Sequence, residues 1–239
     1  MSISITPLDL GTIIRDKSGF TYMKNAGVKI NAPVIGWLVE TKDKKIIVDT
    51  GPNDPETTAE HHKPFLKSKD QEMATVLKKL GVDPNEIETV ILTHLHWDHC
   101  YNTELFTKAS FLVQERELDY ALDPLPIHRH GYDIEPVKST TYTTINGDKQ
   151  IVDGVSVLFT PGHTPGFQSV LLESDGKKAL IASDTIPLFE NWGSAPLPNT
   201  AHYNLSDYCA TLDRIRELNV DLILPGHDIK VFDTEKYRL

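Results

Sequence analysis

The sequence predicts an α/β (α+β) domain of four layers, in which two mixed β-sheets pack face to face and helices cover their outer sides. In each half of the chain, short apolar segments typical of strands are followed by segments with helical spacing. A length of 239 residues is enough to bury a large apolar core. No internal repeat or low-complexity linker divides the chain, so residues 1–239 are predicted to form one domain. Periodicity alone also allows an ordinary doubly wound sheet.

Composition narrows the classes of partner. Hydrophobic residues make up 39% of the chain and charged residues 24%, which is close to ordinary globular values. The net charge is −10, and no basic stripe of the kind that binds nucleic acid is visible. No apolar run approaches the roughly 18 residues of a spanning helix, and the N-terminus shows no export pattern. We therefore expect a cytoplasmic protein that binds small neutral or apolar molecules, not nucleic acid or membrane.

The only two cysteines, Cys100 and Cys209, lie far apart and form no disulfide framework. They are predicted to be reduced, structural thiols, as is usual outside oxidising compartments. Cys100 directly follows the motif described below and is expected to pack beneath it.

Strand and turn signals organise the first half of the chain, beginning with an alternating segment at residues 1–6. Val34–Glu40 and Lys45–Asp49 are predicted strands, joined as a hairpin by the polar turn between them. Apolar residues at helical spacing from Met73 to Leu80 predict a helix, which Gly81 ends. Glu88–Thr93 contains Val-Ile-Leu and is predicted to be a short buried strand.

The second half is predicted to add five strands and two helices. The strands are Ser110–Val113, Ile151–Thr160, Gln168–Glu173, Lys178–Ser183 and Leu222–Leu224. A helix is predicted at Glu115–Leu122, followed by a loop rich in proline and histidine at Asp123–Pro136. Asn204 is predicted to cap the second helix, which carries an apolar face up to Leu218.

The strongest chemical signal directly follows the strand Glu88–Thr93. His94, His96, Asp98 and His99 lie within six residues. Neutral imidazole and carboxylate groups are ligands that suit zinc and similar divalent ions. At a strand end, His94 and His96 point the same way because side chains repeat every two residues. A helical turn beginning at residue 97 would bring the other two to a neighbouring position, so that one segment can serve two metals.

Three later residues occur in a similar context. His163, Asp184 and His227 are each the first strong metal ligand after an apolar strand. A glycine precedes both histidines, which lets the backbone turn sharply and approach a metal closely. We therefore predict that these three side chains complete the site begun by the motif.

This ordered series resembles the metallo-β-lactamase superfamily, whose fold is αββα, over a stretch from Asp49 to His227. The resemblance implies two divalent metal ions in one site. It assigns the first metal to His94, His96 and His163, the second to Asp98, His99 and His227, and a bridging position to Asp184. Zn²⁺ is the expected metal, with Mn²⁺, Co²⁺ or Fe²⁺ as alternatives.

The site so described predicts a metal-dependent hydrolase. A hydroxide bridging the metals would attack an ester-like carbonyl. Asp98 and Asp184 are the predicted catalytic residues: the first orients the water or carries its proton, and the second holds the metals at a fixed spacing. Thr93 and Asp49 are candidates for hydrogen bonds to the free ring nitrogens of the histidines.

Among branches of the superfamily, the sequence is most similar to the quorum-quenching N-acyl homoserine lactonases. The compact length, the strand region at residues 32–39 and the aromatic Trp97 inside the motif support this. One residue departs from the pattern, because Pro187 stands where these lactonases typically have a tyrosine that contacts the substrate carbonyl. Tyr22, Tyr101 or Tyr203 could replace that tyrosine.

The walls of the substrate pocket are predicted from neighbouring aromatic and apolar residues. Trp97, Tyr22, Met23 and Phe189 are the candidate substrate-binding residues. His128 and His130 lack the strand-end context of the ligands and are interpreted as loop residues at the entrance.

Three functions stay open at this point. The leading hypothesis is opening of a lactone, an N-acyl homoserine lactone or a similar small molecule. The alternatives are a phosphotriesterase or other esterase that uses the same site, and a non-catalytic zinc-binding protein of the same fold. A homodimer is also left open.

Overall fold

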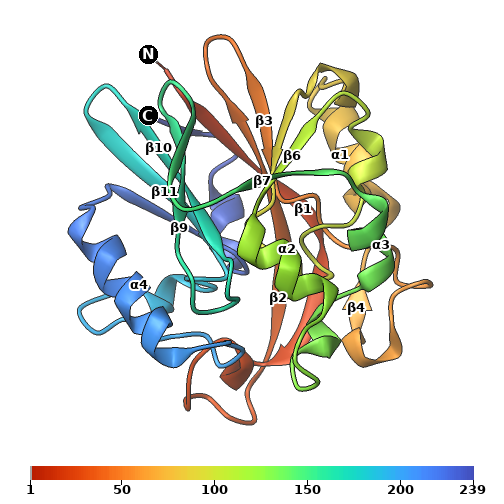
Figure 1. The fold of residues 1–239 in the computed structure, drawn as a ribbon, viewed down its shortest axis with the longest axis vertical. Helices are drawn as coiled ribbons and strands as arrows, with labels where there is room; N and C mark the ends of the chain where they lie inside the picture. Colours follow the sequence, from red (N-terminus) through yellow and green to blue (C-terminus); the bar gives the residue numbers. More distant parts are fainter. Residues whose placement is uncertain (1) are drawn as a thin grey trace.

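The computed structural model describes residues 2–239 and consists of two β-sheets packed on each other, with helices outside (Figure 1). The first sheet has eight strands in the order β13-β1-β2-β3-β5-β6-β7, and β4 pairs with β1. The second sheet has five strands in the order β12-β11-β10-β9-β8. The predicted fold class is therefore confirmed. A doubly wound sheet is wrong for this chain, because there are two sheets and both contain antiparallel pairs.

The strands divide between the two sheets, and the helices lie outside them. In the first sheet the strands are β1 (Ser4–Asp16), β2 (Lys29–Glu40), β3 (Lys45–Val48), β4 (Phe65–Leu66), β5 (Thr89–Ile91), β6 (Ser110–Gln114), β7 (Tyr142–Ile145) and β13 (Tyr237–Arg238). In the second they are β8 (Lys149–Val152), β9 (Val155–Phe159), β10 (Gln168–Ser174), β11 (Lys177–Ser183) and β12 (Leu222–Pro225). The helices are α1 (Met73–Lys79), α2 (Glu115–Leu122), α3 (Ile134–Ser139) and α4 (Leu205–Glu217).

Three apolar clusters hold the layers together. Leu77 and Val137 belong to the cluster between the first sheet and α1, α2 and α3. Trp37 and Val170 belong to the cluster between the two sheets, which draws on strands from both halves of the chain. Leu212 of α4 packs in the third cluster, against the outer face of the second sheet. Burying a side chain of this size contributes about 1.5–3 kcal/mol, so these interfaces hold the loops at the ends of the strands in place.

Most predicted elements are confirmed at nearly their predicted bounds. The predicted hairpin is the β2–β3 pair, and α2 spans Glu115–Leu122 as predicted. Asn204 caps α4, because its side chain accepts hydrogen bonds from the backbone N–H groups of Ser206 and Asp207. These are the elements with the clearest period or capping signal.

Three predictions about local structure are corrected. The predicted strand Ile151–Thr160 is a hairpin, β8–β9, that turns before Val155 through Gly154, whose φ of +76° suits glycine. The predicted loop Asp123–Pro136 gives way to α3 at Ile134. The N-terminal strand runs on to Asp16, because it pairs along most of the length of β2. In each case pairing or packing with distant residues decided the outcome.

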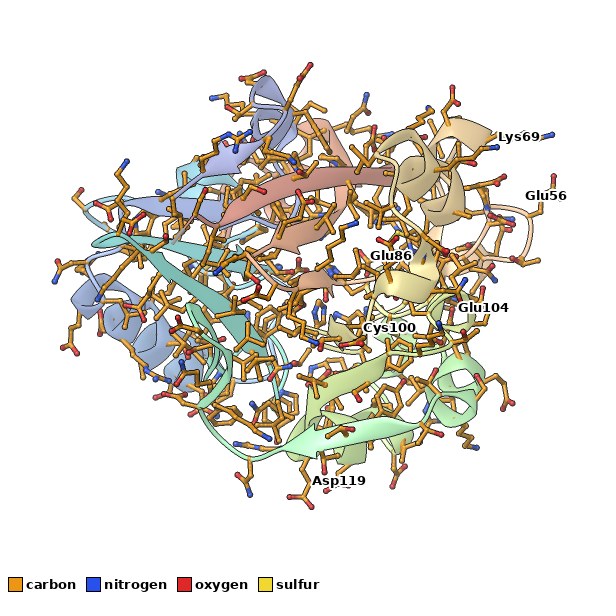
Figure 2. All side chains as sticks on the ribbon, turned by 90° about the horizontal axis from the view of Figure 1, so that it is seen from above. Glu56, Lys69, Glu86, Cys100, Glu104 and Asp119 are labelled. Atoms are coloured by element: carbon orange, nitrogen blue, oxygen red, sulfur yellow. The ribbon has the colours of Figure 1, made fainter. Side chains whose placement is uncertain are left out.

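The two cysteines differ in environment. Cys100 is buried, and its Sγ lies 3.5 Å from the carbonyl oxygen of Leu95, within the motif it follows. Figure 2 shows Cys100 among interior side chains, whereas the labelled Glu56 and Lys69 lie at the surface. Cys209 is a free thiol, as predicted, but it is exposed on α4, so the prediction of a structural residue is wrong there. Within residues 2–239, no helix has the length and apolar character needed to cross a membrane.

Candidate metal centre

Four loops bring the predicted metal ligands to one end of the sandwich. The loop after β5 carries the motif, and the loops after β9, β11 and β12 carry His163, Asp184 and His227. Donor atoms of the seven side chains form three overlapping groups, within each of which they lie 4.8 Å or less apart. The groups are His94 with His96 and His163, His94 with His99 and Asp184, and Asp98 with His99 and His227.

The first set consists of three histidines. His94 Nε2 lies 3.0 Å from His96 Nδ1, and His163 Nε2 lies 3.1 Å from the same atom. Ligand atoms bound at about 2.0–2.1 Å to one tetrahedral zinc ion lie roughly 3.3 Å from each other. These spacings, with the ligand atoms of the three histidines all within 4.8 Å of one another, suit ligands of a single ion.

The second set lies beside the first, and Asp184 faces both. His99 Nε2 and His227 Nε2 lie 3.6 Å and 3.8 Å from Asp98 Oδ2. Asp184 Oδ2 lies 3.4 Å from His163 Nε2, and its Oδ1 lies 3.5 Å from His99 Nε2 and 3.0 Å from His227 Nε2. One carboxylate thus directs one oxygen to each set, which is the arrangement that a bridging ligand requires.

Asp49, in the loop after β3, orients the motif from behind. Its Oδ1 accepts a hydrogen bond from the Thr93 backbone N–H at 2.7 Å, and its Oδ2 accepts one from the Thr93 hydroxyl at 2.8 Å. The same Oδ2 lies 2.9 Å from His99 Nδ1. The Thr93 hydroxyl also lies 3.1 Å from His94 Nδ1. Asp49 therefore holds Nδ1 of His99, and Thr93 holds Nδ1 of His94. Both nitrogens face away from the metal site, as is usual for the ring nitrogen of a metal ligand that binds an outer partner.

Backbone carbonyl groups hold two of the remaining imidazoles. His163 Nδ1 lies 2.6 Å from the carbonyl oxygen of Ala201, and His227 Nδ1 lies 2.8 Å from that of Pro33. A carbonyl can only accept, so in both rings Nδ1 carries the hydrogen and Nε2 is left with its lone pair toward the cluster. The chain thus selects the tautomer that binds a metal through Nε2.

Electrostatics favour the ligand form of the first set. Burial, together with neighbouring histidines, holds the pKa values of His94 and His96 well below the usual value for histidine. Burial also lowers the pKa of His163. The three imidazoles are therefore neutral near pH 7, and only neutral imidazole binds a metal.

In the second set, which consists of Asp98, His99 and His227, nearby carboxylates favour a proton on histidine. Burial acts to lower the pKa of His99, but the carboxylates of Asp98, Asp184 and Asp49 raise it to about 10. Burial likewise opposes ionisation of Asp184, yet His227 and His99 hold its pKa well below the usual value. In the metal-free protein the second set therefore carries a proton that an incoming cation must displace.

The donor set fits divalent metal ions. His99 Nε2 is buried and has no hydrogen-bond partner among residues 2–239. Leaving a buried polar atom in this state costs about 1–3 kcal/mol, and a bound cation removes that cost. A structural zinc site needs only four ligands, whereas seven nitrogen and oxygen donors meet here. The excess favours two ions.

The ligands are accessible from a cavity of about 500 Å³. Its floor is formed by ligands from both sets, namely His96, Asp98, His163, Asp184 and His227. Its walls come from the end of β1, from the segment 61–62 and from the loop at 130–131. A small molecule in this cavity therefore contacts both halves of the cluster.

Comparison with known proteins identifies the family. The family model of the metallo-β-lactamase superfamily matches residues 34–227. This chain belongs to the metallo-β-lactamase superfamily. The chain is also 29% identical to the N-acyl homoserine lactonase AiiA of Bacillus thuringiensis subsp. kurstaki, over 92% of this chain and 91% of that protein.

Solved structures of superfamily lactonases share the fold. A crystal structure of a Bacillus thuringiensis AiiA mutant with N-decanoyl-L-homoserine bound at the active site matches with a TM-score of 0.81. It is 27% identical and covers 96% of this chain and 95% of that chain. An N-acyl homoserine lactone hydrolase with N-hexanoyl-L-homoserine bound at its catalytic metal centre matches with a TM-score of 0.81 and 26% identity, over 96% of this chain and 95% of that one.

Within this superfamily member, Glu117 of α2 joins the two loops that carry the first set. Its side chain is fully buried. Oε1 accepts a hydrogen bond from the backbone N–H of Leu95, between the first two ligands of the motif, at 3.0 Å. Oε2 accepts one from the backbone N–H of Gly166, in the loop of His163, at 3.1 Å. Glu117 was not predicted from the sequence; its signal was an acidic side chain on the same helix face as the buried Ala121.

The ring of His96 packs directly on Gly131. A Cβ atom at Gly131 would lie 2.8 Å from Cδ2 and Nε2 of the ring. We therefore expect Gly131→Ala to displace His96 and weaken metal binding by about tenfold or more, measured by competition with a chelator. Gly193→Ala is the matched control, because a Cβ there meets nothing within 4 Å. Equal metal affinities in the two variants would contradict this packing argument.

Trp97 lines the cavity but is mostly buried. Only 6% of its surface is exposed. Its ring stacks on His62 with centroids 4.1 Å apart and meets the edge of Phe65 at 5.3 Å. The indole therefore packs in the cluster between the first sheet and its helices, and only part of it reaches the cavity.

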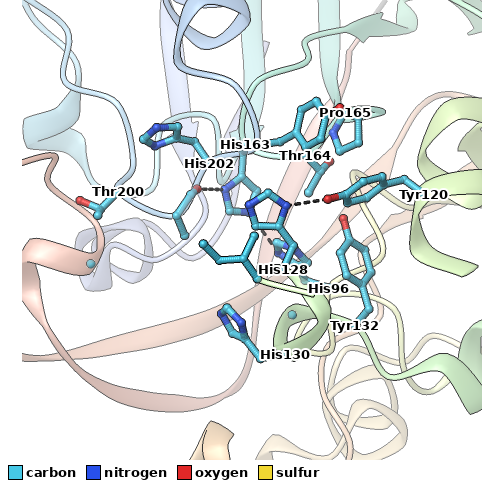
Figure 3. A pocket seen from close by; sticks show the side chains of 15 residues that line it. His96, Tyr120, His128, His130, Tyr132, His163, Thr164, Pro165, Thr200 and His202 are labelled. Atoms are coloured by element: carbon cyan, nitrogen blue, oxygen red, sulfur yellow. Dashed lines mark hydrogen bonds between the residues drawn. The ribbon is translucent and has the colours of Figure 1, made fainter. Parts of the chain in front are cut away.

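The other residues predicted for the pocket lie elsewhere. A neighbouring cavity of about 360 Å³ shares His96, Gly131 and His163 with the one over the ligands (Figure 3). Tyr22, Met23 and Phe189 line neither of the two cavities. Met23 is 84% exposed, and Tyr22 packs against His202. Phe189 packs against the cluster between the two sheets. Their nearness in sequence to the predicted loops did not bring them to the site, because the loops turn their side chains outward or into the core.

Pro187 and the three tyrosines that could replace the tyrosine of the lactonases lie in different parts of the fold. The carbonyl oxygen of Pro187 accepts a hydrogen bond from the backbone N–H of His227 at 2.8 Å, so Pro187 supports a ligand loop. Of the three candidate tyrosines, Tyr203 lines the neighbouring cavity, and Tyr22 and Tyr101 line neither. His128 and His130 lie in cavity walls and in none of the ligand groups.

Proposed function

We propose that this protein is a metal-dependent hydrolase that opens lactones, with N-acyl homoserine lactones as the substrate class. The observation that carries the proposal is the carboxylate of Asp184, which directs one oxygen to each of two ligand sets. The relatives named N-acyl homoserine lactonase, which align over 92% of this chain, supply the substrate class.

Two divalent ions would occupy the two ligand sets, and we propose Zn²⁺, with Mn²⁺, Co²⁺ or Fe²⁺ as alternatives. His94, His96 and His163 would hold one ion, Asp98, His99 and His227 the other, and Asp184 both. Imidazole and carboxylate donors suit ions of this group. Such ions act as Lewis acids on a carbonyl oxygen and make a bound water acidic near neutral pH.

The chain's own residues would orient the substrate and move one proton. Asp98 lines the cavity and directs Oδ2 toward His227 of the second set, so its carboxylate would be within reach of both an attacking water and a substrate in the cavity. We propose that it takes the proton from the attacking water and gives it to the ring oxygen as the lactone opens. Asp49 and Thr93 keep the histidines in place during this step.

The deciding experiment is a substrate panel on protein loaded with zinc, manganese or cobalt. We expect N-acyl homoserine lactones to be hydrolysed with higher kcat/KM than phosphotriesters or simple aryl esters. A preference for phosphotriesters would replace the lactonase by the second candidate, since two metals serve both reactions. Fully metallated protein that hydrolyses none of the panel would support a non-catalytic role.

We expect purified, reconstituted protein to contain about two divalent ions per chain. The reason is the division of seven donors into two sets that share Asp184, as dinuclear sites require. Elemental analysis after saturation with zinc and removal of excess metal measures the ratio. A reproducible ratio of one would exclude the dinuclear arrangement.

We further propose that residues 1–239 act as one domain in the cytoplasm on small molecules and not on nucleic acid. The cluster between the sheets uses strands from both halves of the chain, which supports one domain. Both cysteines are free, as is usual in a reducing compartment. The net charge of −10 disfavours a polyanionic partner.

A further inference from the structure

Arg15 lies at the end of β1, in the wall of the cavity over the metal ligands. Among residues 2–239 it is the only lysine or arginine that lines this cavity, and none lines the neighbouring one (Figure 3). Ile13, Phe20 and Trp97 form an apolar part of the same cavity. Because a guanidinium stays charged at all ordinary pH values, Arg15 supplies a permanent positive charge to a molecule held there.

Two backbone carbonyl groups hold the guanidinium of Arg15 in position. Nη1 donates to the carbonyl oxygen of Ile14 at 3.1 Å, and Nη2 donates to that of His62. The ring of His62 in turn stacks on Trp97, inside the metal-binding motif. Arg15 is thus tied to the loop that carries the ligands. Its planar group is oriented before a ligand arrives, which lowers the entropic cost of binding.

The charge of Arg15 has no ion-pair partner in the described part of the chain, residues 2–239. A guanidinium has five N–H groups, and the two bonds to carbonyl oxygens leave three of them free. The adjacent Asp16 also lines the cavity, but its carboxylate accepts hydrogen bonds from Ser18 and from the backbone N–H of Gly27. Burial lowers the pKa of Arg15, and the charge of Asp98 opposes this effect. Asp98 itself directs Oδ2 toward the second ligand set, so the free N–H groups of Arg15 are available to a bound molecule.

A partly buried guanidinium with free N–H groups suits a carboxylate. Its planar fork matches the two oxygens of that group, and the two charges offset each other. Arg15 belongs to the wall, whereas the metal ligands form the floor. It would therefore meet a substituent of a lactone, and not the ester carbonyl held at the metals.

We propose that Arg15 binds a carboxylate on the substituent of the lactone, so that the site prefers acidic lactones to neutral lactones of the same size. The proposal rests on the proposed lactonase function and narrows its substrate class to N-acyl homoserine lactones, or similar lactones, whose substituent ends in a carboxylate. The carboxylates of Asp98 and Asp184 on the floor do not oppose such a substrate, because they face the metal ligands and would share their charge with divalent cations.

The experiment compares two substrates that differ in one group. N-succinyl homoserine lactone ends in a carboxylate, and N-succinamoyl homoserine lactone ends in a carboxamide of the same size. We expect the zinc-loaded protein to hydrolyse the acid with a kcat/KM about tenfold or more above that of the amide, as is usual for a hydrogen bond between charged groups. Calorimetry with the two ring-opened products, which are not turned over, should show the same preference in Kd.

Arg15→Met should abolish the preference and leave kcat/KM for the carboxamide nearly unchanged. Arg15→Lys keeps the charge without the planar fork and should retain part of the preference. Arg129→Met is the matched control, because Arg129 is exposed next to His130 of the cavity wall but lines neither cavity. It should keep the full preference of the wild type.

Equal kcat/KM values for the two substrates in the wild type would overturn the proposal, and this comparison needs no variant to fold. A preference that survives in Arg15→Met would also overturn it. Loss of the preference in Arg129→Met as well would assign it to the overall field of the protein and remove the role of Arg15. In all three cases lactones are still hydrolysed, so the proposed function stands. Absence of hydrolysis of both substrates and of N-hexanoyl homoserine lactone would contradict the proposed function itself.

Discussion

Asp184→Ala is expected to abolish most hydrolysis and to remove at least one metal ion per chain. Asp184 directs an oxygen to each ligand set, so both sets lose a donor when it is removed. Mutating even an outer partner of a metal ligand typically costs 10–100-fold, so losing a shared ligand should cost at least about 100-fold in kcat/KM. Elemental analysis and lactone assays on the same preparation measure both effects.

His128→Ala and His130→Ala provide the contrast for metal content. Both histidines lie in cavity walls, but neither belongs to a group of ligand donors. Each variant should therefore keep about two metal ions per chain under the same reconstitution. Equal loss of metal in all three variants would mean that the ligands are misassigned.

Glu117→Gln is expected to weaken metal binding without touching a ligand. The carboxylate accepts hydrogen bonds from Leu95 and Gly166 through different oxygens, and an amide would present a donor to one of these N–H groups. A buried N–H without a partner costs about 1–3 kcal/mol, so the midpoint of thermal unfolding should fall. The loops of His96 and His163 would separate, and zinc affinity should fall by about tenfold or more.

Glu115→Gln is the matched control for this variant. Glu115 begins the same helix but is exposed, so its replacement should change neither the unfolding midpoint nor zinc affinity. If Glu117→Gln lowers the unfolding midpoint but binds zinc as tightly as the control does, Glu117 contributes to stability and not specifically to metal binding. Chelator competition separates the two results because it reports on the metal directly.

Elements were predicted correctly from the sequence where a single short segment determines the structure. The helix Glu115–Leu122 and the cap at Asn204 depend on period and on local hydrogen bonds, and both are present in the structure. The strands β5, β11 and β12, which precede three of the ligand loops, were found for the same reason. By contrast, the β8–β9 hairpin was predicted as one strand, because its apolar residues continue across the turn at Gly154.

The residues of the cavity walls show the limit of local signals. Trp97 lies between two motif residues, yet its ring packs on His62 and Phe65, which the sequence does not connect with it. Met23 and Phe189 looked equally suitable as wall residues and lie outside both cavities. Nothing in the sequence near Glu117 shows that its carboxylate reaches two loops from different sheets.

The sequence by itself predicted the identity and order of the seven donor side chains, because four follow one apolar strand and the other three each follow a further strand, and these strand signals are local. It also determined the net charge and the main helices. Tertiary structure alone decided the distances within the cluster, the position of Asp184 between the two ligand sets, the contacts of Glu117 and the residues that line the cavity over the ligands. These depend on how two sheets pack across an apolar interface, and that packing joins residues far apart in the chain.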